Sequence, residues 1–356
     1  MKSVDHILFV VPGFPADEND TTCVPGVQDL VFGLQQAAPG VRHSVITLQY
    51  PYTREPYDWH GIRVYPCGGE DRRFPFRLMA WAQAGRYFRS MPKLTLIHSM
   101  WLTEAAWLAS RWSKRHGIPH VCTMMGQDAL PSNAYLKLPG MRSVHCVALC
   151  NRQDQAFANT TGRRADAVIP IAHHIQLSEG GMERDVDVLG VGSLVPGKAF
   201  GDFVDVVGTL IAGHPNLRAV ILGDGPERSM LMRKINDAGL QKNIVLAGQV
   251  PRDEVIRWMK RSKVLLQPSL YEGFGMVPFE ALSQGMRVVT RPVGDNAVGD
   301  HWHVGNTCPE LADAVQAFLQ MPPRTSGNIV HSVASMVESY GREYERLSRK
   351  SLVNSQ

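Results

Sequence analysis

The segment that decides the fold is Tyr271 to Ala281, which reads YEGFGMVPFEA. It follows an apolar β-branched run at Val264 to Leu266 and enters a helix-forming stretch from about Met276. Gly273 and Gly275 permit backbone conformations closed to other residues and let a ligand approach the main chain. A helix that begins there points free amide groups and the positive end of its dipole at whatever precedes it, which favours phosphate. The segment therefore predicts a phosphate-binding turn between a strand and a helix.

Apolar runs of this kind recur along the chain and alternate with helical segments. The first series lies at residues 7–11, 44–48, 94–98, 120–123 and 144–149, and the second at 186–191, 219–222, 244–246, 264–266 and 287–290. Strands that are apolar on both faces and alternate with helices form parallel sheets sandwiched between helices. The predicted fold class is therefore α/β, with two doubly wound parallel-sheet domains and a cleft between them.

Domain boundaries follow from the length and from changes of pattern. A chain of 356 residues favours two domains. Residues 1–170 and 186–328 hold the two series of runs, and residues 171–185 lose periodicity and gain glycine and polar residues, which predicts a linker. Residues 329–356 begin with apolar side chains at helical spacing and predict a C-terminal helix. We expect this helix to cross back and pack toward the N-terminal domain.

Composition excludes several classes of protein. The chain is 44% hydrophobic and 20% charged, so it is neither disordered nor collagen-like. Six scattered cysteines with no C-x-x-C pair indicate the reduced usage of a cytoplasmic protein. No stretch approaches the roughly 18 to 20 apolar residues that a membrane span needs, so any membrane contact would be peripheral.

The formal net charge is +4, and one segment is distinctly basic. Residues 72–93 carry six basic side chains and no acidic one, interleaved with aromatic residues. Two interpretations stay open: a solvated helix face, or attraction to a phosphate-rich partner or an anionic membrane surface. We expect no nucleic-acid partner.

The pattern E-G-F-G-x-x-x-x-E-A, which spans Glu272 to Ala281, closely resembles the signature of the family-4 retaining glycosyltransferases of GT-B fold. That resemblance implies two Rossmann-like domains, the second of which holds most of a nucleotide-sugar donor. It implies that Glu272 contacts the hydroxyls of the donor sugar and that Glu280 contacts the ribose of the nucleotide. The main chain facing the sugar and the diphosphate would be that of Gly273, Phe274, Gly275 and Met276.

A second glycine-containing turn, GSLVPGKA, follows the strand predicted at 186–191. It differs from a Walker A loop because Ala199 cannot hold magnesium as Ser or Thr would, and Pro196 has no amide N–H to offer a phosphate. The turn instead resembles the donor-phosphate turn of the same family, formed here from Gly192 onward. In that case Lys198 neutralises the leaving diphosphate. The family usually has Arg where this chain has Ser193.

Other donor-side segments also follow the family order. Gly223 and Gly225 fit a turn beneath the nucleotide, and Gln249 and Val250 would approach its base. A structural interpretation, as simple strand-to-helix turns, is equally open for these residues. In the N-terminal domain, a long first loop bears Gly13 and Gly26 where the family folds a glycine-containing loop over the diphosphate.

Two polar residues are candidates on the acceptor side. The segment LIHSMWLTEAAWLAS contains His98, and the segment GIPHVCTMMGQDAL contains Asp128. Both segments resemble acceptor-side segments of the family, which often places a His where this chain has Met125. A lone histidine on a strand is also a common structural residue. The predicted catalytic set is Glu272, Lys198, Asp128 and His98.

No metal site or cofactor is expected. The pair Asp185 and Asp187 lies at a strand entrance, where carboxylates are mostly solvated, and His173 with His174 lacks further ligands at zinc-like spacing.

The predicted function is retaining, metal-independent transfer of a sugar from a nucleotide-diphosphate sugar to an acceptor hydroxyl. The resemblance favours a hexosyltransferase of cell-envelope or exopolysaccharide biosynthesis that acts on a sugar or lipid-linked acceptor in the cytoplasm or peripherally at the inner membrane face. One alternative is a non-catalytic homologue that binds nucleotide sugar or a partner enzyme, because Ser193 and Met125 depart from the family pattern. A less favoured alternative is a P-loop-like NTPase.

Overall fold

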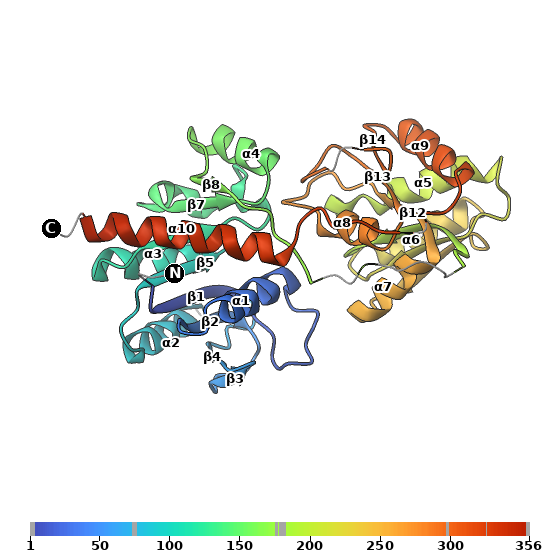
Figure 1. Ribbon diagram of the computed structural model, residues 1–356. Helices are drawn as coiled ribbons and strands as arrows, with labels where there is room; N and C mark the ends of the chain where they lie inside the picture. Colours follow the sequence, from blue (N-terminus) through green and yellow to red (C-terminus); the bar gives the residue numbers. More distant parts are fainter. Residues whose placement is uncertain are drawn as a thin grey trace. The chain divides into compact units, whose positions relative to one another are not determined.

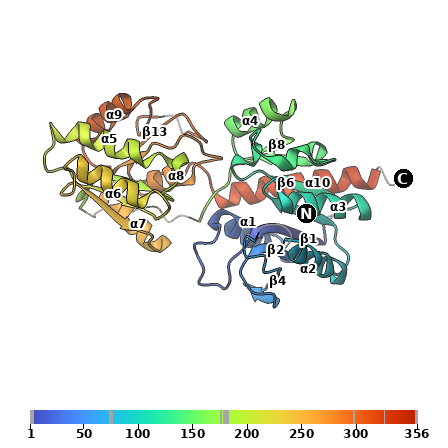
Figure 2. The ribbon, with the colours of Figure 1, turned by 180° about the vertical axis from the view of Figure 1, so that it is seen from behind.

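The structure, a computed structural model, describes residues 4–72, 77–174, 177, 183–296, 299–324 and 326–353. The chain forms two compact α/β units (Figures 1 and 2). The first comprises Met1–His174 and His331–Gln356, and the second Ile175–Val330. Each unit is built on one largely parallel sheet, which confirms the predicted fold class.

One eight-stranded sheet forms the centre of the first unit (Figure 1), in the order β3-β4-β2-β1-β5-β6-β7-β8. Its strands are β1 (His6–Gly13), β2 (Arg42–Tyr50), β3 (Tyr57–Trp59), β4 (Ile62–Pro66), β5 (Leu96–Met100), β6 (His120–Thr123), β7 (His145–Ala148) and β8 (Ala167–Val168). Neighbouring strands are parallel except for β3 with β4. Residues 6–11 of β1 are all buried, as expected of a strand that is covered on both faces.

Helices cover both faces of this sheet (Figure 2). They are α1 (Pro25–Ala37), α2 (Arg77–Ser90), α3 (Glu104–His116), α4 (Asn151–Thr161) and α10 (Val333–Val353), with short 3₁₀ turns η1 (Gln127–Ala129), η2 (Ala134–Lys137) and η3 (Met141–Ser143). Gly117 and Gly162 end α3 and α4 in the left-handed conformation that glycine adopts readily.

The C-terminal helix α10 packs on the first unit. Its Tyr340 and Tyr344 are at most 1% exposed. A Cβ on Gly33 of α1 would lie only 2.7 Å from Val337, so glycine lets the two helices approach closely. The helix begins at Val333 rather than at residue 329 because Ser332 caps it: its Oγ accepts the amide hydrogen bond of Ser335 at 3.1 Å.

The second unit has a six-stranded, fully parallel sheet in the order β11-β10-β9-β12-β13-β14. Its strands are β9 (Val186–Val191), β10 (Ala219–Leu222), β11 (Ile244–Gly248), β12 (Ser262–Gln267), β13 (Arg287–Thr290) and β14 (Trp302–Val304). Its helices are α5 (Phe200–Ile211), α6 (Arg228–Asp237), α7 (Arg252–Arg261), α8 (Met276–Ser283) and α9 (Cys308–Gln320), and η4 (Pro196–Lys198) is a 3₁₀ turn. Phe200 and Phe203 of α5 are fully buried against β9, where Gly190 leaves room for their rings.

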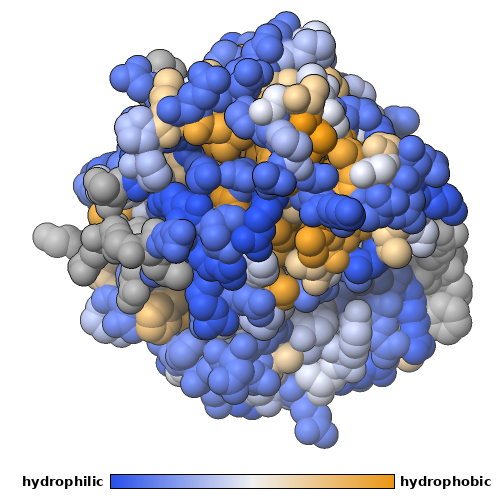
Figure 3. Space-filling view, turned by 90° about the vertical axis from the view of Figure 1, so that its right-hand side faces the viewer, coloured by the Kyte–Doolittle hydropathy of each residue, from blue (hydrophilic) through white to orange (hydrophobic). Residues whose placement is uncertain are grey.

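The molecular surface is not uniformly polar. Figure 3 shows a face on which hydrophilic side chains surround a hydrophobic area near the middle. Among the described residues of the second unit, the most exposed large apolar side chain is Leu270, at 60%, in the loop that follows β12. That loop belongs to the candidate site described next.

Candidate active site

The strand order of the second sheet identifies a place for a ligand. The chain runs outward through β9, β10 and β11 on one side and through β12, β13 and β14 on the other, so its direction reverses between the neighbours β9 and β12. In open α/β sheets, ligands bind outside the carboxyl ends of the strands at such a switch point. The loops after β9 and β12 contain the two predicted donor-binding motifs. The topology therefore brings residues 192–199 and 268–275 together.

Lys198 and Glu272 meet at this switch point. Nζ of Lys198 lies 2.6 Å from Oε1 of Glu272, and their side chains are 26% and 15% exposed. The amide of Leu270 donates a hydrogen bond to the carbonyl oxygen of Gly197 at 2.9 Å, which ties the two loops together. The side-chain amide of Gln267 lies 3.5 Å from the same Glu272 oxygen. The residues predicted to bind diphosphate and sugar thus form one partly exposed ion pair.

Close packing of the backbone explains why glycine occupies positions 223 and 225, both predicted to bind the donor. A Cβ on Gly223 would lie 1.9 Å from the carbonyl oxygen of Gly192, and a Cβ on Gly225 would lie 2.5 Å from that of Leu194. The loops after β9 and β10 therefore pack backbone against backbone, and a side chain does not fit between them. Ser193 is exposed on the same turn.

The motif turn ends in a left-handed glycine. Gly275 has a φ of 86° directly before α8, whose first residue is Met276. Gly273 and Phe274 are buried, and the Phe274 ring stacks on Phe279 with centroids 5.1 Å apart. Packing therefore accounts for the side chain of Phe274. A Cβ on Gly275 would lie 3.7 Å from Cβ and Cγ of Glu272, so α8 begins beside the side chain of the motif's first glutamate.

Glu280 is 8% exposed and has a cationic partner that the motif does not reveal. Nη2 of Arg252 lies 3.0 Å from Oε1 of Glu280. Arg252 opens α7, shortly after Gln249 and Val250, the residues predicted to approach the base. The structure thus adds a guanidinium beside the carboxylate predicted to bind ribose. In the sequence, the one sign that Arg252 belongs to the site is its position directly after Gln249, Val250 and Pro251.

Arg291, a second arginine that sequence reasoning missed, follows β13 at the same edge of the sheet. Its Nη2 lies 2.7 Å from Oδ2 of Asp202 on α5, and its Nη1 donates a hydrogen bond to the carbonyl oxygen of Pro268 at 2.6 Å. Arg291 therefore braces the loop after β12 against α5. Because both terminal nitrogens of the guanidinium group are engaged, we assign Arg291 a positioning role.

In the first unit, the carboxylate of Asp128 organises a turn. It accepts amide hydrogen bonds from Leu102 at 2.7 Å, Met125 at 3.2 Å and Gly126 at 2.8 Å. Burial raises the pKa of Asp128, and these amide donors oppose the rise. The residue fixes the main chain where β5 and β6 end, and a direct contact with an acceptor stays a prediction.

His98 lies in the interior, on β5. Its Nδ1 hydrogen-bonds the hydroxyl of Tyr344 at 2.6 Å, and its Nε2 bonds Oγ1 of Thr123 at 2.8 Å. Burial, with a contribution from His120, lowers the pKa of His98 to about 3. Since the side chain is fully buried and both ring nitrogens are occupied, packing accounts for His98 without a ligand.

Glu104, at the first turn of α3, was not singled out from the sequence. It is 5% exposed, accepts hydrogen bonds from Gln49 and from the indole of Trp81 at 3.1 Å, and lies 3.9 Å from Arg77. Glu104 follows β5 in the chain, and Asp128 follows β6, so both residues come after the carboxyl ends of neighbouring strands. Glu104 is therefore a further acceptor-side candidate.

The glycines predicted in the first loop are placed differently. A Cβ on Gly26, inside α1, would lie 2.5 Å from Ile171, so Gly26 serves helix packing. Gly13 ends β1, and a Cβ there would make only ordinary contacts with Tyr50. Their role over a diphosphate stays a prediction.

The other acidic and histidine pairs have protein partners. Asp185 pairs with Arg261 at 2.6 Å, and Asp187 pairs with Lys263 at 2.7 Å. Nδ1 of His173 lies 3.0 Å from Asp29. Within the described ranges, no group of three His, Cys, Asp or Glu side chains is arranged to hold a metal ion.

Two family models match the chain in the order of its two units. Residues 24–178 match the glycosyl transferase 4-like domain, and residues 178–321 match the glycosyl transferases group 1. The boundary between the two matches lies close to the boundary between the two compact units.

Curated relatives are similar over part of their length. The chain is 29% identical over 172 residues to the phosphatidylinositol N-acetylglucosaminyltransferase gpi3 subunit of Schizosaccharomyces pombe, which covers 47% of this chain and 38% of that protein. It is 25% identical over 273 residues to a putative teichuronic acid biosynthesis glycosyltransferase of Bacillus subtilis, TuaC, covering 67% of each. The alignments with three of the relatives span 38%, 55% and 24% of those proteins' own length.

Among solved structures, the fold is similar to that of Anabaena HepE in complex with UDP and glucose. The TM-score is 0.68 at 16% identity, and the alignment covers 99% of this chain and 100% of that one. At this identity the likeness concerns the fold. Two glycosyltransferase domains, matched in order on two parallel-sheet units of this fold, show that the chain belongs to the family-4 type of GT-B glycosyltransferases.

Proposed function

We propose that the chain is a retaining, metal-independent glycosyltransferase that moves a sugar from a nucleotide-diphosphate sugar to an acceptor hydroxyl. The observation that supports this most is the Lys198–Glu272 ion pair at the switch point of the second sheet. It puts an ammonium group and a carboxylate where the diphosphate and the sugar of a donor would lie. The similar Anabaena structure is a complex with UDP and glucose, which supports the same class of donor.

The proposed chemistry requires charge stabilisation on the diphosphate as it leaves. Lys198 would neutralise part of that charge, and the amide groups at the start of α5 and α8 would add their dipoles. Glu272 would accept hydrogen bonds from the sugar hydroxyls. Because Glu272 already holds Lys198, the ammonium group is oriented before the donor arrives, which reduces the reorganisation needed in the reaction.

The nucleoside would bind farther along the same edge. The carboxylate of Glu280 would accept hydrogen bonds from the ribose hydroxyls while Arg252, 3.0 Å away, holds it in place. Gln249 and Val250 would contact the base.

We propose retention because the chain resembles the retaining family, and no nucleophile of the described residues is invoked for it. The acceptor oxygen attacks the anomeric carbon on the face from which the diphosphate leaves, so one carbon–oxygen bond forms as the other breaks. The acceptor proton passes to the leaving phosphate oxygen. Charge on that oxygen is stabilised by Lys198, and no cofactor is needed in this scheme.

The acceptor is proposed to be a sugar or a lipid-linked sugar of cell-envelope or exopolysaccharide biosynthesis. The name of the Bacillus relative, which refers to teichuronic acid, supports this product class. Asp128, His98 and Glu104 belong to the acceptor side in this proposal, with Asp128 and His98 acting through the main chain and the sheet that they hold.

An anionic membrane surface is the proposed partner of the basic segment 72–93. In α2, Ala84 and Phe88 pack inward, whereas Leu78 and Met79, which directly follow Arg77 in the chain, are 45% and 54% exposed. Residues 73–76 lie outside the described residues. No helix in the described part of the chain combines the length and apolar character that a bilayer crossing requires. Cosedimentation with anionic vesicles at low salt tests this proposal of a cytoplasmic, peripheral protein, and the absence of binding would reject it.

The experiment that tests the proposed activity has two readouts on the same purified chain. A thermal-shift screen against nucleoside diphosphates and their sugars reports donor binding, and release of nucleoside diphosphate reports turnover. NMR of the product anomer tests retention, and turnover in a chelator tests metal independence. Binding without turnover on any acceptor would favour the non-catalytic homologue, which the exposed Ser193 supports as second candidate. Neither binding nor turnover would reject both.

A further inference from the structure

The first sheet has a switch point of its own. Strands β2, β3 and β4 lie on one side of β1, and β5, β6, β7 and β8 follow on the other side, so the strand order reverses between the neighbours β1 and β5. In open α/β sheets, ligands bind outside the carboxyl ends of the strands at such a point. The residue that directly follows β5 is Trp101.

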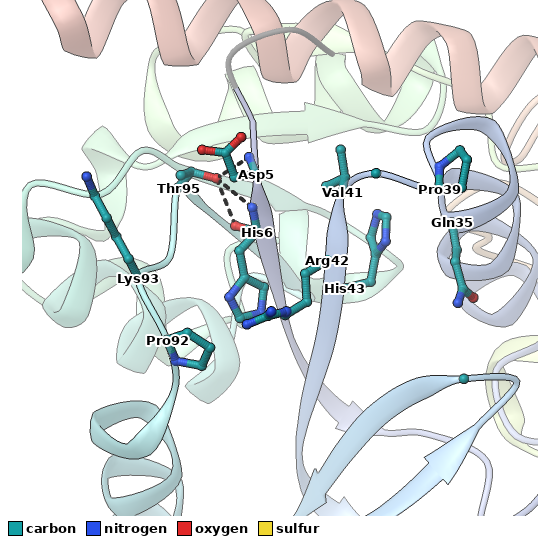
Figure 4. A pocket seen from close by; sticks show the side chains of 12 residues that line it. Asp5, His6, Gln35, Pro39, Val41, Arg42, His43, Pro92, Lys93 and Thr95 are labelled. Carbon is teal, nitrogen blue, oxygen red and sulfur yellow. Dashed lines mark hydrogen bonds between the residues drawn. The ribbon is translucent and has the colours of Figure 1, made fainter.

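The opposite edge of this sheet is less suited to a ligand. A cavity of about 560 Å³ opens there, where the strands begin (Figure 4). His6 and His43 line it, but these residues are only 3% and 5% exposed. A ligand in this cavity would therefore meet little of either imidazole ring. The carboxyl edge is the better place for a ligand of the first unit.

Trp101 has a backbone conformation that bulky residues rarely adopt. Its φ is 65°, in the left-handed region that favours glycine. Hydrogen bonds hold the main chain here: the amide of Trp101 donates to the carbonyl oxygen of Thr123 at 2.9 Å, and the amide of Leu102 donates to the carboxylate of Asp128 at 2.7 Å. Strain that its surroundings enforce in this way is concentrated at ligand sites. Glycine would meet the same backbone requirement, so the tryptophan side chain needs an explanation of its own.

Half of the strained non-glycine residues lie at the two switch points. Of the six such residues with positive φ in the described chain, Val24 and Trp101 lie in the loops after β1 and β5, and Ala199 lies in the loop after β9. Ala199 directly follows Lys198, the residue proposed to meet the diphosphate. The first unit therefore has, at its own switch point, the kind of strained turn that the candidate donor site has in the second unit.

The indole of Trp101 is available to an external partner. The residue is partly exposed, and within the described residues its ring makes no contact with another aromatic ring and its N–H donates no hydrogen bond. By contrast, Trp81 packs on Trp107 with centroids 5.0 Å apart and donates its N–H to Glu104. Thr103, two positions after Trp101, is also partly exposed, and its hydroxyl makes no capping hydrogen bond at the start of α3.

We propose that Trp101 is the platform on which the terminal pyranose ring of the acceptor packs. A pyranose has an apolar face of C–H groups and a rim of hydroxyl groups. The indole would cover the apolar face, and the indole N–H and the hydroxyl of Thr103 would bind the rim. The choice of a sugar rests on the proposed function, whereas the strained, partly exposed tryptophan at the switch point does not. Trp101 would thus select a cyclic sugar over an acyclic polyol.

Fluorine NMR of the full chain labelled with 5-fluorotryptophan tests the platform without requiring turnover. The chain has seven tryptophans, and the signal missing from Trp101→Phe belongs to Trp101. The probes are the methyl glycosides of glucose, galactose, mannose and N-acetylglucosamine, with sorbitol as the acyclic control. We expect at least one glycoside to shift the Trp101 signal saturably and sorbitol to leave it unchanged. No saturable shift with any of the four would overturn the platform, even if the chain transfers sugar, and an equal shift with sorbitol would overturn the preference for a ring. A shift in a chain that shows no turnover would support the platform and count only against the proposed activity.

Two variants separate contact with the sugar from a structural role. Trp101→Gly fits a φ of 65° and removes the ring, so the variant should fold but bind the responding glycoside at least about tenfold more weakly in a ligand-observed NMR titration. Trp101→Phe keeps an aromatic ring and should lose only about threefold. Trp112→Phe is the matched control: Trp112 lies on α3 and stacks on Phe88 at 4.6 Å, and its replacement should leave the affinity unchanged. An unchanged affinity in folded Trp101→Gly, or an equal loss in Trp112→Phe, would reject the proposal.

Discussion

Removal of the Lys198 ammonium group should separate catalysis from folding. In the Lys198→Ala variant, the departing diphosphate loses its nearest cation, and Glu272 loses the partner that lies 2.6 Å away. Loss of one such transition-state contact costs about 3 to 4 kcal/mol, which corresponds to a fall in kcat of roughly a hundredfold to a thousandfold. We expect the larger effect on kcat rather than on KM, because charge on the diphosphate grows as the bond to the sugar breaks.

The same change should leave the fold nearly unaffected. The two side chains are 26% and 15% exposed, so water can solvate the carboxylate that remains. An ion pair of this exposure contributes about 0 to 1 kcal/mol to the free energy of unfolding. Urea denaturation of the variant should therefore give a midpoint close to that of the unchanged protein.

A matched control exists in the same unit. Lys234 makes an ion pair of the same length, 2.6 Å, with Asp205, at side-chain exposures of 34% and 51%. It joins α6 to α5 rather than the two switch-point loops. Nucleoside diphosphate release by Lys234→Ala should equal that of the unchanged protein. If Lys198→Ala kept kcat within about threefold of the unchanged value, or fell no further than Lys234→Ala, the assignment of Lys198 to the diphosphate would be wrong.

Three further predictions rest on packing, positioning and protonation. Gly223→Ala should lower the free energy of unfolding by about 1 to 3 kcal/mol, because its Cβ would overlap a carbonyl oxygen 1.9 Å away; an unchanged urea midpoint would contradict this. Arg252→Ala should raise the KM for the donor about tenfold with a smaller change in kcat, since it frees Glu280, and a loss confined to kcat would count against a ribose role. Burial lowers the pKa of His98 and His120 to about 3, below the unfolded value of 6.5, so the unfolded chain binds more protons between those limits. Stability should be full above pH 6.5 and fall as the pH drops toward 3, and urea midpoints of His120→Gln should fall less steeply; equal slopes would show that His120 does not titrate on unfolding.

Local patterns were sufficient for much of the site. The glycines of the E-G-F-G motif and the helix after it predicted a turn that needs glycine's backbone freedom, and the structure gives Gly275 a left-handed φ of 86°. The same motif singled out Glu272 and Glu280, and the turn after the first strand of the second domain singled out Lys198. Each of these predictions depends on residues only a few positions apart.

Residues whose environment comes from distant segments were harder to interpret. Arg252 gains its importance from Glu280, 28 positions away in the chain, and its own neighbours carry no distinctive motif. The segment around His98 predicts an acceptor-side residue, whereas the full burial of its ring depends on α10, whose Tyr344 lies 246 positions later and hydrogen-bonds Nδ1 of His98. Burial of that kind depends on which helix folds back over the sheet.

The sequence by itself determined two parallel α/β units, the turns that open α5 and α8, and the chemical types of the groups in those turns. The spacing of apolar residues and the backbone freedom of glycine are local properties, so they can be read from neighbouring residues. Only the tertiary structure decided that Lys198 and Glu272, 74 positions apart, form one ion pair, because the reversal of strand order makes β9 and β12 neighbours. It also decided that the imidazole rings of His6 and His43 are buried where β1 and β2 begin, since that depends on how separate strands and loops meet at one edge.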